Sequence, residues 1–185
     1  MNARRILLVV SAGIAAYKAP ELVRAWVRAG HSVRCVLTAA ATAFVSPLVL
    51  QSLTGNPVRE SLLDAGEEGT IGHIELADWA ELVVVAPATA NILAKMAHGL
   101  AADLATTVLL ATQAPVLVAP AMNVNMWDHP ATQANLATLR ERGVRTVGPE
   151  AGELACGWEG QGRMSPPETI AAESELALGT GSLSG

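Results

Sequence analysis

The sequence predicts an α/β protein in which helices cover both faces of a parallel sheet. Short apolar runs bounded by Gly or Pro alternate along the chain with longer stretches of helical spacing. The first run is continuous and rich in β-branched residues, as strands buried on both faces are. A chain of 185 residues, of which 51% are hydrophobic, is long enough to bury one such core. We therefore expect one domain with a three-layer, doubly wound architecture.

The first strand–helix–strand unit occupies residues 5–37. Arg5 to Val10 contains the apolar run of the first strand, and Ala15 to Ala29 follows with apolar residues at helical spacing. Gly30 ends this helix, and Ser32 to Leu37 is the second predicted strand. Units of this kind are right-handed and join parallel strands, so the sheet is expected to be parallel.

The alternation continues through the middle of the chain. Buried strands are predicted at Leu82 to Ala86 and at Pro115 to Ala119, and helices at about Ala90 to His98 and Thr132 to Arg142. Residues 148–164 are instead rich in Gly, Glu and Pro, which predicts a functional flap rather than a core element. Residues 1–178 then form the domain. Residues 179–185 are Gly/Ser-rich and are expected to be a linker tail.

Composition excludes several classes of function. The net charge is −5, and the basic residues form no stripe that could neutralise successive phosphates, so no nucleic-acid partner is expected. The apolar run Ile6 to Val10 is too short for a signal peptide or a membrane span, which makes a cytoplasmic protein the expectation. Cys35 and Cys156 have neither disulfide nor metal-site spacing, so no metal is expected.

The loop after the first strand has the composition of a phosphate-binding turn. It reads Ser11-Ala12-Gly13-Ile14, and small residues there let a phosphate approach backbone N–H groups at the start of a helix. It lacks the spacing of a dinucleotide fingerprint, and Thr38 follows the second strand where an acidic residue would hold a ribose. The loop predicts a mononucleotide site, with Thr38 on the terminal phosphate; a plain tight turn is the alternative.

Two further loops bring polar side chains to the ends of predicted strands. One predicted strand is followed by Thr89, Ala90 and Asn91, and the next is followed by residues 121–127, which begin with Ala121. Ligands of open α/β sheets bind at the carboxyl ends of the strands, so both loops are candidates for one site. The alternative for Thr89 is that it caps the following helix.

These loops carry a specific resemblance. Residues 120–127 read Pro-Ala-Met-Asn-Val-Asn-Met-Trp and residues 87–92 read Pro-Ala-Thr-Ala-Asn-Ile, while His73 lies in a Gly-His-Ile-Glu-Leu stretch. They resemble the hallmarks of the homo-oligomeric flavin-containing cysteine decarboxylase family, with Thr89 for serine and Ile92 for threonine in the first hallmark. The resemblance covers residues 5–170 and implies a flavodoxin-like, Rossmann-like fold that binds flavin mononucleotide (FMN).

The resemblance also assigns roles to residues. It implies that His73 is the acid/base, that Asn123 holds the substrate carboxylate, and that Cys156 protonates an enethiol. It implies substrate contacts for Met126, Ala155, Gly157 and Gly162. The cofactor contacts that it implies are Ser11, Ala12, Gly13, Ile14, Thr38, Thr89, Ala90, Asn91 and Ala121. The buried Cys35 and the other histidines, His31, His98 and His129, are expected to be structural.

Residues 154–164 resemble the substrate clamp of phosphopantothenoylcysteine decarboxylases. This implies conversion of 4'-phosphopantothenoylcysteine to 4'-phosphopantetheine in coenzyme A biosynthesis: flavin oxidises the thiol, CO2 is lost, and the enethiol is reduced again. The alternative within the family is a peptidyl-cysteine decarboxylase that forms C-terminal enethiols, against which the clamp with Cys156 argues. A non-catalytic flavin-binding regulatory subunit, or an unrelated hydrolase or dehydrogenase on the same fold, lacks supporting motifs here.

The resemblance finally implies an assembly. Members of the family form homotrimers, often four of them in a dodecamer, so that His73 and Asn123 can serve one site from adjacent protomers. In bacteria the decarboxylase is commonly fused to a phosphopantothenate–cysteine ligase, and residues 181–185 resemble the junction before that domain. A ligase domain is therefore expected to follow this chain in the full-length protein.

Overall fold

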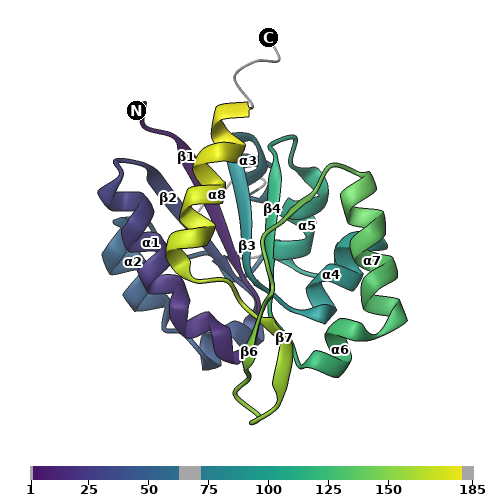
Figure 1. The fold of residues 1–185 in the computed structure, drawn as a ribbon. Coiled ribbons are helices and arrows are strands. Elements are labelled where there is room, and N and C mark those ends of the chain that lie inside the picture. The colour runs from purple at the N-terminus through teal and green to yellow at the C-terminus, as the bar shows by residue number, and fades with distance from the viewer. Residues whose placement is uncertain (1, 63–71, 181–185) are drawn as a thin grey trace.

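A five-stranded parallel sheet lies between two helical layers in the computed structural model, which describes residues 2–62 and 72–180 (Figure 1). Its strand order is β2-β1-β3-β4-β5, and every adjoining pair is parallel. This confirms the predicted doubly wound fold. The strands of the sheet are β1 (Arg5–Val10), β2 (Ser32–Leu37), β3 (Leu82–Ala88), β4 (Val116–Pro120) and β5 (Arg145–Thr146).

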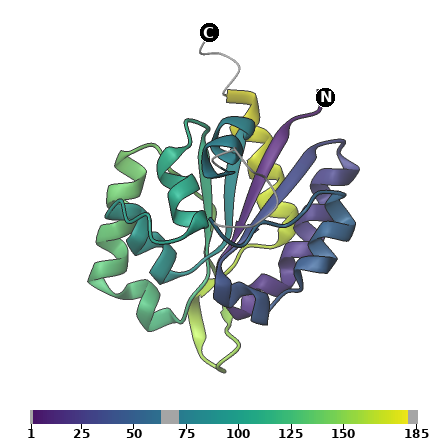
Figure 2. The same ribbon diagram turned by 180° about the vertical axis from the view of Figure 1, so that it is seen from behind.

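Helices cover both faces of the sheet, and β1 shows why. Ile6, Leu8 and Val10 pack into one hydrophobic cluster while Leu7 and Val9 pack into the other, because successive strand residues face opposite sides. Both faces of β1 are thus apolar, as its continuous apolar run predicts. The helices on one face are α1 (Ala19–Arg28), α2 (Pro47–Thr54) and α8 (Pro167–Thr180), and α8 crosses in front of the sheet in Figure 1. The helices on the other face, seen in Figure 2, are α3 (Gly72–Trp79), α4 (Ala90–Ala97), α5 (Leu104–Ala111) and α7 (Pro130–Glu141).

Several element boundaries differ from the sequence prediction. The single helix expected over residues 15–29 is divided into a 3₁₀ helix, η1 (Ile14–Lys18), and α1, because Pro20 suits a first helical turn better than an interior position. Strand β3 continues two residues beyond the predicted end. Elements that the sequence analysis did not predict are η2 (Ala39–Ala43), α2, α3, α5, α6 (Val124–Asp128), β5 and α8.

The predicted flap is a β-hairpin of β6 (Glu150–Glu153) and β7 (Glu159–Arg163), which pair antiparallel. The hairpin lies directly on the loop after β4, where the Met122 N–H donates to Gly162 O at 2.9 Å. Gly162 has a φ of +153°, and a side chain there would collide with Met122 O. At the other end of the flap, α8 runs through residue 180, so the first residues of the expected tail are helical; residues 181–185 lie outside the described part.

The three histidines expected to be structural each have a local role. His31 is buried, and its Nδ1 accepts a hydrogen bond from the Arg4 N–H at 3.1 Å. That nitrogen is therefore unprotonated, so Nε2 carries the proton and donates to Glu175 Oε1 at 2.6 Å, which ties α8 to the β1–β2 edge. His98 is the exposed C-cap of α4, and His129 caps the start of α7.

We expect His31→Ala to lower the free energy of unfolding by about 2 kcal/mol, because it leaves a backbone N–H and a carboxylate without their partner. At this chain length the loss corresponds to a decrease in Tm of about 4–8 °C, measured by differential scanning calorimetry. His98→Ala is the matched control and should leave Tm nearly unchanged, since His98 is exposed. Equal effects of the two substitutions would contradict the stabilising role of the hydrogen bonds that His31 makes with Arg4 and Glu175.

Candidate active site

A pocket of about 1010 Å³ opens at the carboxyl edge of the sheet. Its walls come from the loops that follow β1, β2, β3 and β4, together with the β6–β7 hairpin. The strand order reverses next to β1, which leaves a crevice between the loops after β1 and β3, and ligands of doubly wound sheets bind at such a point. The pocket thus lies where the fold itself favours ligand binding.

Most of the residues predicted for the site meet in this pocket. All of those predicted for the cofactor line it, as do Asn123 and Cys156. The predicted substrate contacts Met126, Ala155 and Gly162 line it as well, but Gly157 does not. His73 is also absent from the lining: it is the second residue of α3 and half-buried. Its catalytic role stays a prediction.

Ser11 joins the two loops that form the floor of the crevice. Its hydroxyl donates to Pro87 O at 2.6 Å and accepts from the Thr89 N–H at 3.2 Å. The register of β3 against β4 shifts between Val85 and Ala88, so Pro87 lies in an irregular stretch of the strand. One buried side chain therefore fixes the separation of the loops after β1 and β3.

Two threonines begin helices at the pocket wall. Thr89 is the N-cap of α4, and its Oγ1 accepts from the Ile92 N–H at 3.3 Å, which confirms the capping role considered for it. Thr38 is the N-cap of η2 but makes no side-chain capping hydrogen bond. Because the Thr38 hydroxyl is not used for capping, it can serve as a donor to a ligand in the pocket.

The amide of Asn123 has a defined orientation. Its Oδ1 accepts from the Asn125 N–H at 2.8 Å as the N-cap of α6, which leaves Nδ2 as the group that faces Cys156. Nδ2 donates to Cys156 Sγ at 3.5 Å. A backbone hydrogen bond involving Trp158, followed by the Asn123 amide, lowers the pKa of the Cys156 thiol from its ordinary value of 9.0.

Cys35 provides a contrast within the same chain. It lies inside β2 and is buried, and this burial raises the pKa of its thiol to about 12. Cys156 is exposed on the hairpin. Only the second thiol thus combines access to solvent with a lowered pKa, the two properties that make a cysteine reactive.

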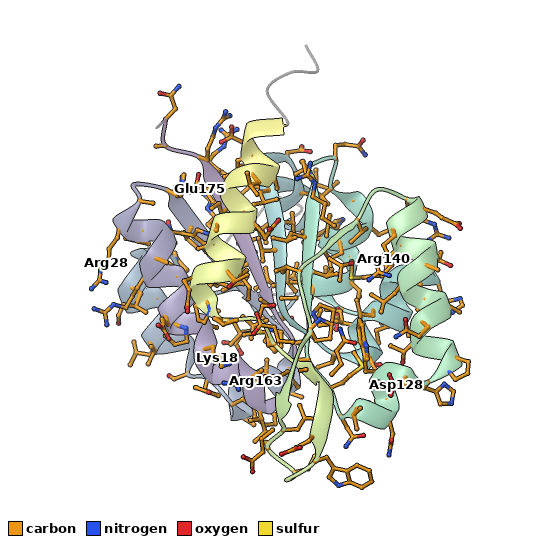
Figure 3. All side chains as sticks on the ribbon, in the orientation of Figure 1. Lys18, Arg28, Asp128, Arg140, Arg163 and Glu175 are labelled. Carbon is orange, nitrogen blue, oxygen red and sulfur yellow. The ribbon has the colours of Figure 1, made fainter. Side chains whose placement is uncertain are left out.

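The pocket also contains charged residues that the sequence analysis did not assign. Lys18, Lys95 and Arg163 line it together with the carboxylates of Glu153 and Asp103. Figure 3 shows Lys18 and Arg163 at the end of the molecule where the hairpin lies. Lys18 is the last residue of η1, which begins at the end of the loop after β1, and Arg163 directly follows the last glycine of the flap. Proximity to this loop and to the flap is the signal that could have identified the two residues.

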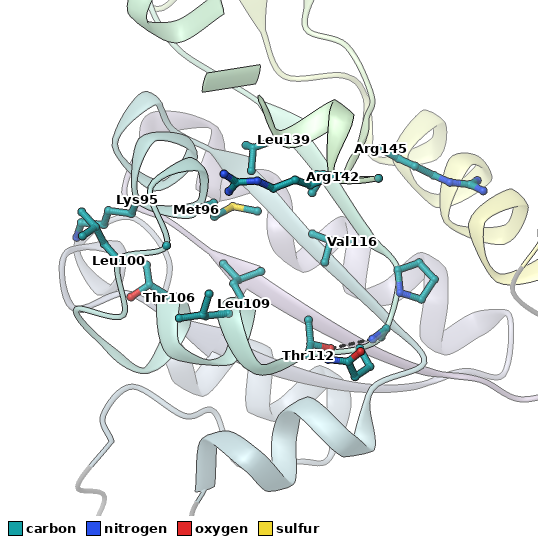
Figure 4. Close-up of a pocket in the computed structure, with 17 residues that line it drawn as sticks. Lys95, Met96, Leu100, Thr106, Leu109, Thr112, Val116, Leu139, Arg142 and Arg145 are labelled. Carbon is teal, nitrogen blue, oxygen red and sulfur yellow. Dashed lines mark hydrogen bonds between the residues drawn. The ribbon is translucent and has the colours of Figure 1, made fainter. Parts of the chain in front are cut away.

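A second pocket, of about 620 Å³, lies between α4, α5, α7 and the start of β4 and contains none of the residues predicted for the site (Figure 4). Arg142 crosses it and donates to Ala97 O at 2.8 Å, while Arg145 extends away from Arg142. Within residues 2–62 and 72–180, no three His, Cys, Asp or Glu side chains gather as metal ligands. No helix in the same ranges is long and apolar enough to cross a bilayer.

Comparison with known proteins agrees with this geometry. Two relatives are bifunctional coenzyme A biosynthesis proteins named CoaBC. That of Vibrio cholerae is 54% identical over 172 residues, which cover 93% of this chain and 43% of the relative. That of Escherichia coli K12 is 53% identical over 167 residues, which cover 90% of this chain and 41% of the relative. The chain thus spans less than half the length of these relatives.

Solved structures show the same fold. A variant of PPC decarboxylase in complex with pantothenoylaminoethenethiol superposes with a TM-score of 0.85 at 34% identity, covering 95% of this chain and 98% of the other. The FMN-dependent cysteine decarboxylase SpaF superposes with a TM-score of 0.82 at 34% identity, covering 97% of each chain. The model of the Flavoprotein family matches residues 1–176. The chain belongs to the Flavoprotein family.

Proposed function

We propose that this chain is the FMN-dependent domain that decarboxylates 4'-phosphopantothenoylcysteine to 4'-phosphopantetheine. The observation that carries the proposal is the contact between Asn123 and Cys156 at the pocket wall, 33 positions apart in the sequence. It places a donor for a carboxylate beside a thiol of lowered pKa. Similarity to coenzyme A biosynthesis proteins and to PPC decarboxylase supports this substrate. We assign the reaction to the cytoplasm.

The residues of the pocket fit FMN. Small residues dominate the wall formed by the loops after β1, β2, β3 and β4, which leaves room for a flat ring system; they are Ala12, Gly13, Ala15, Ala39, Ala40, Ala90 and Ala121. Thr38 offers an uncommitted hydroxyl and Lys18 a positive charge for a phosphate. Bound FMN supplies two-electron oxidation of the substrate thiol and the reverse reduction.

Asn123 and Cys156 act at successive stages of the proposed reaction. The Nδ2 of Asn123 holds the carboxylate of the substrate cysteine until CO2 leaves, because the capping bond fixes the opposite side of the amide. Cys156 then delivers a proton to the enethiol, since its lowered pKa makes the thiol a better acid. The hairpin that carries Cys156 also lines the pocket, and we propose that it keeps water from the intermediate.

His73 completes the proposed site from a neighbouring copy of the chain. His73 lies outside the pocket of its own protomer, whereas Asn123 and Cys156 line that pocket. A homo-oligomer, proposed as a trimer or a dodecamer of four trimers, brings the first turn of α3 to the corresponding pocket of a neighbouring protomer. We also propose that a ligase domain follows the chain, since its relatives are bifunctional and more than twice as long.

We expect Cys156→Ser to separate the two halves of the reaction. In single-turnover mass spectrometry with 4'-phosphopantothenoylcysteine, the wild type should release CO2 and form the saturated thiol. The variant should release CO2 but accumulate the enethiol, because it lacks the proton donor. Cys35→Ser is the matched control and should form the saturated thiol. No turnover of this substrate, but decarboxylation of a peptide with a C-terminal cysteine, would favour the peptidyl-cysteine decarboxylase instead.

We expect Thr38→Val to weaken FMN binding about tenfold or more, because it removes a hydrogen bond to a charged phosphate. Fluorescence titration of the apoprotein with FMN measures the Kd. Thr42→Val is the matched control: Thr42 lies on the same short helix, is exposed, and donates to Ala39 O rather than facing the pocket. Unchanged affinity in Thr38→Val would place the phosphate elsewhere.

The pH dependence of alkylation should distinguish the two thiols. The rate of Cys156 modification by iodoacetamide should have its midpoint below pH 9.0, because the pKa of this thiol is lowered and the thiolate is the nucleophile. Asn123→Leu should move the midpoint upward. Cys35 should stay unmodified across the same range, since it is buried and its pKa is about 12. A midpoint above 9.0 for Cys156 would contradict the proposed interaction.

A further inference from the structure

The helix that carries His73 is fastened to the sheet by an arginine of β2. Arg34 Nη1 donates to Glu75 Oε1 at 2.8 Å. The guanidinium carbon of the same arginine lies 4.5 Å from the centre of the Trp79 ring. Glu75 is in the first turn of α3, two residues after His73, and Trp79 ends the helix. One side chain of the sheet therefore contacts α3 at both ends.

A second arginine contacts the first residue of α3. The Arg59 N–H donates to Cys35 O and Arg59 O accepts from the Leu37 N–H, both at 3.0 Å, so this residue adds a bridge to the outer side of β2. Its guanidinium lies against Gly72, where a Cβ would be only 2.5 Å from Arg59 Nη2. The residue immediately before His73 is thus packed against the Arg59 guanidinium, which would have to move to admit a side chain at position 72.

Neither arginine belongs to the pocket. Arg34, Glu75 and Trp79 are all absent from the lining of the pocket of their own protomer. The Arg34 and Glu75 side chains are 30% and 36% exposed, and ion pairs of this exposure stabilise proteins little. A planar guanidinium that meets a carboxylate and an aromatic face at once nevertheless fixes orientation. The arrangement therefore matters more for the position of α3 than for stability.

Among the described residues, α3 is also supported from its core side. Leu76 and Ala77 are buried in the hydrophobic cluster beneath the helix, and the carbonyl of Ala77 accepts from Thr112 Oγ1 at 3.4 Å. Apolar contacts are not directional, so they fix the rotation of a two-turn helix less closely than directional polar contacts do. The Arg34 contacts oppose such rotation.

We propose that Arg34 is a positioning residue for His73, acting through Glu75 and Trp79. The inference rests on the proposed function, in which His73 is the acid/base. A proton-transfer group must be held within hydrogen-bond reach of the reacting atom, and an error of about 1 Å can cost up to about 100-fold in rate. Arg34 keeps the first turn of α3 in place so that His73 reaches the neighbouring pocket.

The test compares turnover of 4'-phosphopantothenoylcysteine by flavin-loaded variants. Arg34→Met and Glu75→Gln should each lower kcat about tenfold while KM, FMN occupancy and Tm stay close to wild type. Arg34→Lys should be intermediate, because it keeps the charge but lacks the planar face. Arg28→Met, on the last turn of α1, is the matched control and should not change kcat. If Arg34→Met fails to fold, Glu75→Gln, which preserves side-chain shape, takes its place.

The decisive measurement uses a His73→Asn background. If Arg34 acts through His73, adding Arg34→Met there should not lower the residual rate further. The inference is overturned if the residual rate decreases by the same factor as in the wild type, or if Arg34→Met and Glu75→Gln both keep full kcat. Failure of the proposed function gives a different result: the flavin-loaded wild type would not decarboxylate the substrate, and the inference would fail with it.

Discussion

The reversal of strand order at β1 is the constraint on which the site depends. From β1 the chain goes to β2 on one side and then returns to β3 on the other, so the loops after β1 and β3 leave toward different helical layers. The space between them is set by the backbone, and Ser11 fixes its width through Pro87 and Thr89. The other walls of the pocket, which are the loops after β2 and β4 and the β6–β7 hairpin, surround this pair of loops.

The loop after β4 connects that crevice to the hairpin. The Ala121 N–H donates to Ala88 O at 3.1 Å, and the next amide, of Met122, donates to Gly162 O at 2.9 Å. Two consecutive N–H groups thus bind the loop to β3 on one side and to β7 on the other. Because Gly162 has no side chain, the hairpin can approach closely enough for Cys156 to reach Asn123. The proposed catalytic pair, Asn123 and Cys156, thus depends on a backbone contact that neither residue makes.

The sequence predicts those parts of the structure that local patterns determine. The apolar runs of β1, β2 and β3 identify buried strands, and parallel strands bring their following loops to one edge, which is why the predicted cofactor residues lie in one pocket. Thr89 could be predicted as a cap from its position alone. By contrast, β5 has only two residues and is defined by pairing with β4, so no apolar run marks it.

Features that depend on distant contacts could not be predicted in this way. The flap was recognised by its glycines, but the hairpin rests on the contact between Gly162 and Met122, about forty positions away. Helix α3 was not predicted because it has only eight residues, of which Leu76 and Ala77 are buried, and this is too short to show a helical period. Its contact with Arg34 of β2 is likewise not visible in a local pattern. The motif around His73 indicated a residue type for the reaction, but no local pattern indicates which pocket that residue serves.

The direction of α3 limits where His73 can lie. A helix that leads into a strand of a parallel sheet runs antiparallel to it, so the start of α3, with His73, is the end of this helix nearer the carboxyl edge, although α3 lies toward the end of the sheet opposite the hairpin (Figure 1). The contact between Gly72 and Arg59 agrees, because Arg59 bridges to Val36 near the end of β2. His73 therefore lies outside the pocket of its own protomer, on the helix whose Leu76 and Ala77 pack into the second hydrophobic cluster. Residues 76 and 77 are buried, so moving His73 to that pocket within one chain would pull α3 out of the core, whereas a neighbouring copy can supply its histidine without any change in the fold. This is why we propose an assembly, rather than a rearrangement of one chain, to complete the site.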